Sequence, residues 1–455
     1  MPSHTERITS STRSIPPTST VLRVQILVAA ALLGAVAYVL TPVVGPRGQA
    51  AAGAVCFFLI VAACSMNLHA VNWRTIGWGI ALQVGLAMVI LKLQIGRVRP
   101  GYALFTAIAG VVKKFLEFTA AGSQFVFGGL ADPAVMGKVF PGGLVFAFTA
   151  LPTIIFVSSF FTVLYYFGVL QLVVRLMARA MISLMRTSGA ETLSAAANVF
   201  MGQTEAPLIV KPYVPGMTQS ELLAMMVGGM ATVSGGVMAV YISMGADPVA
   251  ILTTSVMAAP CGLYLSKLML PELEQPATRE GATVAVERAH VNVIDAAAAG
   301  ASDGMILAIN VAAMLIAFLA FIALFDYLLG LVHAGLSLSR VFSWVFAPVA
   351  FLIGVPRADV PAVADLLGTK LVANEFVAFV KLTSQYDGVI SERAHVLSTF
   401  ALTGFANFAS IGIQLGGIGG MAPARRHDLA RLGMRALLVG FIATMINASI
   451  AAILL

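Results

Sequence analysis

The sequence predicts an all-α polytopic membrane protein in which two structural repeats contain broken transmembrane helices. Of its 455 residues, 59% are hydrophobic and 10% are charged, and the mean hydropathy is +0.94. Soluble domains carry about a quarter charged residues, so a soluble fold of this composition would expose apolar surface everywhere. Apolar runs of the roughly 20 residues that a bilayer-spanning helix needs recur along the chain. Four further apolar segments are interrupted by glycine, proline and polar residues, which predicts the breaks.

The first part of the chain combines a polar tail with uninterrupted apolar runs. Residues 1–20 are rich in serine, threonine and proline, a composition typical of disorder. The run after them is too long for the core of a signal peptide, so we expect a retained anchor helix there. Continuous spans are predicted at Val21–Val44, Ala51–Val71, Ile76–Ile95, Leu144–Val174, Pro248–Met269, Met305–Val332 and Ala430–Leu455.

One helix between these spans has a different character. The segment Tyr102–Leu130 mixes apolar residues with Lys113, Lys114 and Glu117. This pattern predicts an amphipathic helix that lies along the membrane surface or packs between other helices.

The interrupted segments occur in the same order in both halves of the chain. A hydrophilic linker, 271–304, separates a first repeat (101–270) from a second repeat (305–428), with N-terminal spans before them (21–100) and one helix after them (429–455). Broken helices are not tolerated against lipid, so they are expected to be buried in protein or to line a wet cavity. Matched interruptions in two halves indicate a secondary transporter with a midplane binding site. The interrupted segments are Gly189–Val214, Glu221–Gly245, Ala362–Leu382 and Leu397–Gly420.

Charge and side-chain chemistry exclude several other classes. The formal net charge is +7, but the basic residues punctuate loops rather than form a patch, which argues against nucleic acid as a partner. Arg7, Arg13 and Arg23 favour a cytoplasmic N-terminus. The three cysteines and six histidines show neither disulfide nor metal-ligand spacing, so no cofactor is expected. An intramembrane enzyme is therefore a weak alternative, and a passive channel would need a filter motif that is not seen.

The first polar cluster is Asn198–Pro207, where a carboxylate, a hydroxyl and two amides stand between apolar flanks. Gly202 and Pro207 allow a tight reversal, which predicts the tip of a helical hairpin that enters the membrane and returns. A carboxylate at that depth costs at least a few kcal/mol, so Glu205 would need a counter-charge, a ligand or a proton. The alternative is a loop tip in headgroup water.

The second cluster, Gly368–Phe379, places Asn374 and Glu375 in the middle of an apolar segment. Lys370 could neutralise a nearby carboxylate. Alternatively, it could extend its ammonium to the membrane interface, with Glu375 near the same boundary.

Two glycine-rich clusters complete the set. In Gly404–Gly417, Asn407 and Ser410 are three residues apart and would share a helix face, and Phe405 could stack on a flat ring. In Gly228–Ala239, the glycines favour a break, and Thr232 and Ser234 offer oxygens to a hard cation. Simple small-residue helix packing is the alternative for both clusters.

Together these segments resemble the concentrative nucleoside transporter family, over roughly Ala51–Leu455. The family pattern G-x-K-x-x-x-N-E-F-V-A-(Y/M/F) is met at every fixed position by Gly368–Phe379, and Gly202–Pro207 and Gly404–Ser410 match as well. The resemblance implies a homotrimer in which each protomer has a scaffold and a moving transport domain with two re-entrant hairpins, one in each repeat. It also implies a multi-pass protein of the bacterial inner membrane.

The resemblance further assigns roles to individual residues. Gln203, Thr204 and Glu205, with Val237 and Phe405, would surround the base. The ribose hydroxyls would be bound by Glu375, Asn407 and Ser410. A site that hydrogen-bonds ribose would reject analogues without those hydroxyls, because its own polar groups would be left unpaired.

The resemblance also places a sodium ion in the lipid-spanning region. The ligands would be the side chains of Asn198 and Thr232 and the carbonyl oxygens of Met201 and Val233. Similar members often carry valine and serine at the Met201 and Thr232 positions, but a carbonyl and a hydroxyl survive both changes. The implied function is sodium-coupled nucleoside symport. Proton coupling is the alternative, although proton-coupled relatives differ around Gln203–Glu205.

Overall fold

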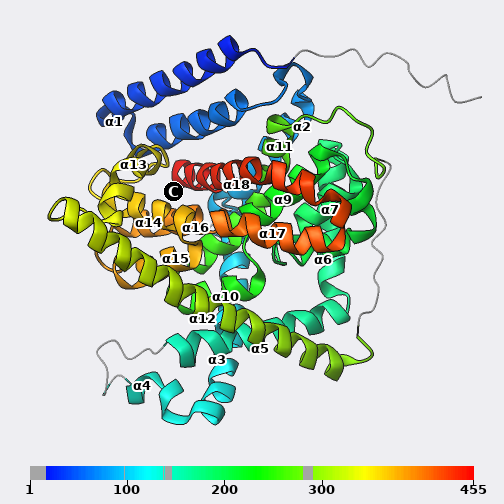
Figure 1. The fold of residues 1–455 in the computed structure, drawn as a ribbon, viewed down its shortest axis with the longest axis vertical. Coiled ribbons are helices and arrows are strands. Elements are labelled where there is room, and N and C mark those ends of the chain that lie inside the picture. Colours follow the sequence, from blue (N-terminus) through cyan, green and yellow to red (C-terminus); the bar gives the residue numbers. More distant parts are fainter. Residues whose placement is uncertain (1–16, 97, 137, 139–145, 280–289) are drawn as a thin grey trace, which may run out of the picture.

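The computed structural model describes residues 17–96, 98–136, 138, 146–279 and 290–455, and these residues form an all-helical fold (Figure 1). Seven of the described helices are long and apolar enough to cross a membrane. The helices are α1 (Thr20–Ala63), α2 (Trp73–Ala87), α3 (Pro100–Phe127), α4 (Pro133–Met136), α5 (Phe146–Tyr166), α6 (Val169–Met185), α7 (Gly189–Ala197), α8 (Ala206–Ile209), α9 (Gln219–Ala231), α10 (Gly235–Ser243), α11 (Pro248–Met269), α12 (Val293–Val332), α13 (Leu338–Leu352), α14 (Val360–Val372), α15 (Glu375–Ser384), α16 (Glu392–Leu402), α17 (Phe408–Met421) and α18 (Arg426–Leu454). Short 3₁₀ turns lie at Leu68–Ala70, Gly128–Ala131, Lys211–Gly216 and Pro423–Arg425, and a π-helical turn at Met88–Lys92 extends α2.

Helix α1 is a helical hairpin rather than one rod. Gly45 has φ of 67°, and this residue with Pro46 after it ends the first arm and turns the chain. The Sγ atom of Cys56 in the second arm lies 3.3 Å from the carbonyl oxygen of Ala30 in the first. Two separate spans were predicted here, and the structure has two arms. The predicted disorder of residues 1–20 falls almost entirely outside the described residues, and α1 begins at Thr20.

Two sequence predictions about helix ends need correction. The span predicted at Leu144–Val174 is divided into α5 and α6, because Gly168 adopts a left-handed conformation with φ of 77°. The hydrophilic linker predicted to end at residue 304 is shorter, since α12 already begins at Val293. Alanine-rich sequence favours helix there, although no long apolar run has yet started.

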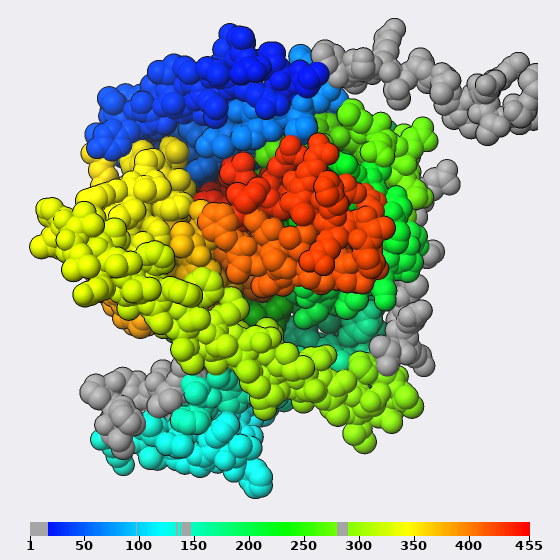
Figure 2. Space-filling model, viewed as in Figure 1, coloured from blue at the N-terminus to red at the C-terminus, as the bar shows by residue number. Residues whose placement is uncertain are grey.

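The helices differ in how much of their surface other helices cover. In the most apolar window of α9–α10, 94% of the residues are buried, and in that of α11 89% are buried, against 11% for α12. The first group therefore forms the core, and α1 and α12 present apolar side chains on the outside. Figure 2 shows α12 running across the surface in front of this core, with α1 along one edge of the molecule.

Helix α12 is held to α5 by close backbone contact. A Cβ atom at Gly304 would lie 2.7 Å from the Cα atom of Ile155, and one at Gly300 would lie 2.8 Å from that of Ser159. The Ser159 hydroxyl also donates to the carbonyl of Ala297 at 2.8 Å. Small residues at such a crossing are how membrane helices pack tightly. The long α12 and α5 therefore act as one pair.

An ion-pair network fixes one end of the core. The Lys267 ammonium, near the end of α11, lies 2.6 Å from the carboxylate of Glu191 and 3.2 Å from that of Glu272. Glu191 and Glu221 close capping boxes at the first turns of α7 and α9. The bases of α7 and α9 are thus held together against α11.

All four segments predicted to be interrupted are broken in the structure. Helix α7 ends before the turn 198–205, which leads into the short α8. Helices α9 and α10 are separated at 232–234, α14 and α15 at 373–374, and α16 and α17 at 403–407. In each half the order is the same: a long helix, a broken hairpin-like segment, then a broken helix. The repeat order predicted from the sequence matches this arrangement.

Candidate functional site

At three of the breaks, the helix that follows begins with the same kind of N-cap. Ser234, Asn374 and Asn407 are the N-cap residues of α10, α15 and α17, and their side chains accept from the backbone N–H groups of Val237, Val377 and Ser410 at 3.4, 2.8 and 2.9 Å. Serine and asparagine are preferred N-caps because their short side chains satisfy these otherwise unpaired donors. The breaks therefore follow from local sequence, and each creates a helix N-terminus with positive electrostatic potential.

The breaks lie against one another in the middle of the fold. The backbone N–H of Phe405 donates to the carbonyl of Thr232 at 3.1 Å, and that of Gly235 donates to the carbonyl of Phe200 at 2.9 Å. A Cβ atom at Gly404, where φ is 147°, would approach the carbonyl of Met230 to 3.0 Å. Only glycine fits there without displacing backbone. The α9/α10 break thus contacts both the hairpin turn and the α16/α17 break.

Glu375 is the centre of a buried polar group at the start of α15. One carboxylate oxygen accepts from the Asn407 side-chain amide at 2.8 Å, and the other accepts from the Tyr241 hydroxyl at 3.1 Å. The Tyr241 ring stacks on Phe379 with centroids 4.0 Å apart. Glu375, Asn407 and Tyr241 come from α15, the α16/α17 break and α10, and all three are buried. A carboxylate held by an amide and a phenol is a strong acceptor for vicinal hydroxyl groups.

Gln203 connects the hairpin turn to this group. Its side-chain nitrogen donates to the Ser410 hydroxyl at 3.2 Å, whereas its Oε1 atom is buried with no hydrogen-bond partner among the described residues. Gln414 on α17 likewise has an unpartnered, buried Oε1 atom, and both glutamines pack against Gly229. A buried acceptor without a partner is costly, so such atoms indicate where a ligand or water donates.

Val237 and Phe405 supply the apolar side of the same region. Val237 is buried in the first turn of α10, and Phe405 is half-buried beside Thr232. Thr204 packs differently: its Cγ2 atom fills the space over Gly417 on α17. These positions follow from the breaks, which place the start of α10 and the start of α17 side by side.

Glu205 stands apart from the Glu375 group. One of its oxygens accepts from the backbone N–H of Gly202 at 3.1 Å, and among the described residues it forms no hydrogen bond to Glu375, Asn407 or Ser410. It lines a cavity of about 730 Å³ between the hairpin turn and the α5–α12 pair. Asp303 of α12 and Lys211 line the same cavity. The sequence left open whether Glu205 lies at a site or in headgroup water, and the structure places it at this cavity, which both apolar and polar side chains line.

The four residues expected to bind a cation lie on two adjoining segments. Asn198 and Met201 belong to the hairpin turn, and Thr232 and Val233 to the α9/α10 break that it contacts. Asn198 is fully buried, and its Oδ1 atom has no partner among the described residues, while its amide nitrogen donates to Ser194 at 3.0 Å. Thr232 donates its proton to the carbonyl of Gly228 at 2.9 Å, which leaves its oxygen free to accept. Buried, neutral oxygen acceptors are what a hard monovalent cation requires.

The side chain of Lys370 is completely buried, so it does not extend to the membrane interface. Its charge interacts electrostatically with the nearby Glu375 carboxylate, although no close ion pair joins the two side chains. Its ammonium donates to the carbonyl of Ala401 at 2.7 Å and to the hydroxyl of Thr444 at 2.9 Å. Ala401 lies in the last turn of α16, where the helix dipole favours a cation. Lys370 therefore ties α14 to the end of α16 and to α18.

Comparison with known proteins decides the family. Models described as the N-terminus and C-terminus of a Na⁺ dependent nucleoside transporter match residues 52–130 and 250–452, and a nucleoside recognition model, Gate, matches residues 147–248. The chain belongs to the concentrative nucleoside transporter family. Together the three models span the broken helices and every residue of the candidate site.

Relatives of this chain are similar to it over most of its length. An uncharacterized transporter of Haemophilus influenzae is 44% identical over 409 residues, covering 88% of this chain and 95% of the relative. Sodium/nucleoside cotransporter 1 of Mus musculus is 42% identical over 89% of this chain, which spans 63% of the mouse protein. The family members are transporters rather than enzymes, so the intramembrane enzyme considered from the sequence is dropped.

Solved structures agree with the fold. The structure of CNTnw in an inward-facing substrate-bound state has a TM-score of 0.84 and 38% identity, covering 89% of this chain and 97% of that chain. A CNTnw variant in an outward-facing state gives the same TM-score. The nucleoside transporter fold, with its scaffold and transport domains, is therefore the fold of this chain.

The N-terminal family model begins at residue 52, in agreement with the predicted start near Ala51, but one relative is similar over more of the chain. A pig sodium/nucleoside cotransporter 1 matches 94% of this chain, so fewer than the fifty residues before Ala51 are left outside the match. The similarity therefore reaches into the first arm of α1, which the sequence analysis had excluded. Apolar spans differ little in composition, so this arm carried no motif by which it could be recognised.

Three residues of this candidate site were not predicted from the sequence. Tyr241, Gln414 and Asp303 stand in helices with otherwise apolar or small neighbours. A buried phenol or amide needs a hydrogen-bond partner, so a tyrosine or glutamine within an apolar helix was the available sign of a polar contact. The partners are supplied by elements far away in the chain, so their identity required the tertiary structure.

Proposed function

We propose that this family member is a sodium-coupled symporter that imports nucleosides by alternating access. The observation that carries the proposal is the convergence of Glu375, Asn407, Gln203 and Ser410 at the meeting point of four helix breaks. Next to them lie two buried oxygens that can accept, the unpartnered Oδ1 atom of Asn198 and the hydroxyl oxygen of Thr232. A neutral, hydroxyl-rich solute suits the first group, and a desolvated monovalent cation suits the second. The family's sodium dependence supports the cation.

Within the nucleoside site, we assign the ribose to the polar group. Glu375 and Asn407 would bind the ribose hydroxyls with Ser410, and Gln203, Thr204 and Glu205 would border the base with Val237 and Phe405. The unpartnered Oε1 atom of Gln203 supports this division, because it can accept from an exocyclic amino group or a ring N–H. An apolar face beside it tolerates any base.

Coupling would arise because the two sites share the hairpin turn. Asn198 and Met201 begin the turn, and Gln203 follows within it. A cation bound to Asn198, Thr232 and the carbonyls of Met201 and Val233 would order the turn and thereby position Gln203 for the nucleoside. Each sodium ion moved inward down a 100 mV potential supplies roughly 2.3 kcal/mol.

The cavity between the hairpin turn and the α5–α12 pair would be the access route on one side. Met201 and Ser234 line it together with the carboxylates of Glu205 and Asp303, so it reaches the proposed cation ligands. CNTnw has been solved in inward-facing, outward-facing and intermediate states, which supports an alternating-access cycle for its relatives. We further propose a homotrimer in the inner membrane with a cytoplasmic N-terminus.

Proton coupling is the second candidate. It is favoured by one observation, the presence of Glu205 and Asp303 in one cavity, because a carboxylate there could carry a proton. The buried neutral oxygens of Asn198 and Thr232 have no such use, and they favour sodium.

Uptake of radiolabelled uridine into proteoliposomes tests the proposal. Sodium, proton and no imposed gradient are compared for the wild-type protein. Accumulation that depends on sodium supports symport with that ion. Accumulation under a proton gradient alone overturns the cation assignment but keeps the transporter. Equal uptake with and without a gradient refutes coupling.

A further inference from the structure

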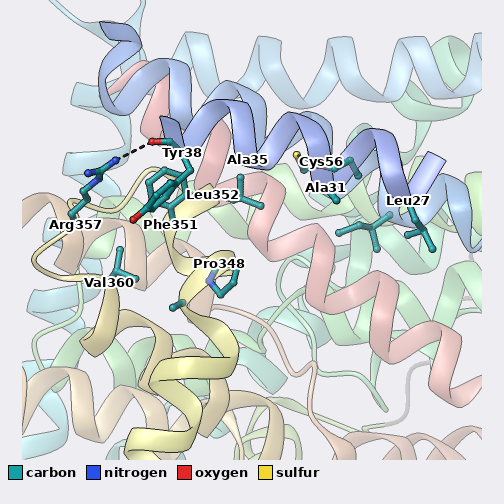
Figure 3. A pocket seen from close by; sticks show the side chains of 14 residues that line it. Leu27, Ala31, Ala35, Tyr38, Cys56, Pro348, Phe351, Leu352, Arg357 and Val360 are labelled. Atoms are coloured by element: carbon teal, nitrogen blue, oxygen red, sulfur yellow. Dashed lines mark hydrogen bonds between the residues drawn. The ribbon is translucent and has the colours of Figure 1, made fainter. Parts of the chain in front are cut away.

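A second cavity lies far from the nucleoside site, on the outer surface of the helical bundle. It is a groove of about 720 Å³ between the hairpin α1, helix α13 and the start of α14 (Figure 3). Its walls are small or apolar side chains such as Ala31, Gly34, Pro348 and Leu352. Arg357 is the one charged residue in the lining.

The groove opens where the protein meets lipid. The first arm of α1 exposes Val24, Val28, Leu32 and Val36, which have between 50% and 61% of their surface uncovered. Apolar side chains exposed along a membrane-spanning helix contact acyl chains. An apolar cavity in that setting is not filled by water, which needs several polar partners. An acyl chain of the surrounding lipid is therefore a suitable occupant.

The dimensions of the groove fit one leaflet. Along α1 the lining runs from Leu27 to Tyr38, and the eleven steps between them, at a rise of 1.5 Å each, give about 16 Å. The hydrocarbon core of a bilayer is roughly 30 Å thick, so each leaflet contributes about half of that. Figure 3 shows Leu27 at one end of the groove and Tyr38 with Arg357 at the other. A single acyl chain has the length and the apolar character that this channel accommodates.

The end at Arg357 has the chemistry of a headgroup site. The guanidinium lies 4.8 Å from the centre of the Tyr38 ring and donates one hydrogen bond, 2.9 Å long, to the Tyr38 carbonyl. Arginine has five N–H donors in a planar fork that matches phosphate oxygens. The side chain is exposed, and tyrosine and arginine are typical of the interface between hydrocarbon and headgroups.

Arg357 provides the positive charge at this end. The α1 turn lies beside the loop that carries Arg357, since the carbonyl of Pro46 would be 3.2 Å from a Cβ atom at Gly354. Arg47 in that turn is directed elsewhere, because its guanidinium donates to the oxygen of Leu455 at 3.2 Å. The nearest acidic residue along the loop, Asp359, accepts from the backbone N–H and hydroxyl of Ser391 rather than from Arg357. The mouth of the groove therefore carries the charge of Arg357.

We propose that this groove is a binding site for an anionic phospholipid, with one acyl chain between α1 and α13 and the phosphate on Arg357. The charge at the mouth selects an anionic over a zwitterionic lipid, and the apolar walls select the chain. The groove contains none of the residues of the proposed nucleoside and sodium sites, so the lipid proposal can be tested independently of the symport proposal.

Native mass spectrometry of the purified full chain tests this site directly. The protein in detergent is titrated with phosphatidylglycerol or phosphatidylcholine of the same chain length, and bound lipid is counted for each oligomeric species. Arg357→Gln removes the headgroup contact, and Ala31→Phe fills the groove, with Gly34→Leu as a second filling variant. The matched controls are Arg431→Gln and Ala29→Phe, which change an exposed arginine and an exposed α1 alanine that do not line the groove.

The expected result is one tightly retained phosphatidylglycerol per chain. Arg357→Gln should weaken its binding about fivefold, because one basic residue near anionic lipid contributes roughly 1 kcal/mol. The filling variants should abolish retention, and both controls should bind as the wild type does. Equal binding by all variants overturns the proposal. So does phosphatidylcholine binding that matches phosphatidylglycerol and is unaffected by Arg357→Gln. A filling variant that changes the oligomeric mass and not the lipid count also overturns it, since a second copy of the chain would then occupy the groove.

Discussion

Replacement of Glu375 by glutamine tests the polar half of the proposed nucleoside site. The carboxylate accepts from Asn407 at 2.8 Å and from Tyr241 at 3.1 Å. In Glu375→Gln, the amide oxygen can still accept from Asn407, and the Tyr241 hydroxyl can turn to accept from the new NH₂ group. The packing should therefore survive, and the change removes mainly the negative charge.

The size of the effect follows from the bonds that the charge would make to substrate. Hydrogen bonds to charged groups contribute about 1.5–3 kcal/mol, which corresponds to roughly 10- to 150-fold in affinity. We expect uridine to bind Glu375→Gln more weakly by a factor in this range. The loss should be much smaller for 2′,3′-dideoxyuridine, because that analogue offers no ribose hydroxyls to the carboxylate.

Binding to purified protein at saturating sodium, measured by isothermal titration calorimetry, gives these affinities. Glu392→Gln is the matched control: Glu392 is also the first residue of a helix after an N-cap, but it is exposed. A thermal melt of each variant verifies folding. The reasoning is refuted if Glu375→Gln binds uridine within threefold of the wild type, or if it weakens both ligands equally.

Four other substitutions address the remaining parts of the site. Asn198→Ala removes the unpartnered oxygen and should raise the sodium concentration for half-maximal uptake about tenfold. The expected loss corresponds to a buried polar contact of roughly 1–3 kcal/mol. An unchanged sodium dependence would exclude Asn198 as a ligand. Asp303→Asn should raise the same concentration a few-fold while leaving uridine affinity at saturating sodium unchanged, and a loss of uridine affinity would contradict its role in the cavity. Gly404→Ala should abolish uptake, because backbone strain of about 1–3 kcal/mol and a backbone clash arise where two helix breaks meet. Gly412→Ala is the control and should transport normally, because a Cβ atom at Gly412 would have no heavy atom within 4 Å. Lys370→Met leaves two buried acceptors unpaired and should lower the melting temperature measured in detergent, and an unchanged melt would show that the ammonium does not stabilise α14 against α16 and α18.

The positions of the helix breaks could be read from the sequence because their causes are local. Asn374 and Asn407 cap the helices that begin after them, and glycine lies near the breaks at Thr232 and Gly404. Short polar side chains compete with helical hydrogen bonds wherever they occur, so an interrupted apolar segment carries its own signal. The motif around Lys370 and Glu375 indicated the family for the same reason, because its residues are neighbours in the sequence.

Other features depended on partners that are distant in the sequence. The hydrogen bonds of Lys370 could not be predicted because its acceptors, Ala401 and Thr444, lie on two helices that only the fold brings to it. Tyr241 was overlooked for the same reason, since its hydroxyl is explained only by Glu375, 134 residues away. The division between α5 and α6 at Gly168 was not predicted because a single glycine in an apolar run is not a sufficient signal for a helix break.

The sequence by itself thus determined the membrane environment, the matched interruptions in both halves and the residue types that carry the chemistry, because hydropathy and capping act over a few residues. Only the tertiary structure decided which of these residues meet. It joined Gln203 to Ser410, placed Asn407 on Glu375 and left the oxygen of Asn198 unpaired in the core. It also placed Glu205 and Asp303 along one cavity and formed the groove beside Arg357. Contacts between distant segments depend on how whole helices pack, and no local pattern in the chain encodes that packing.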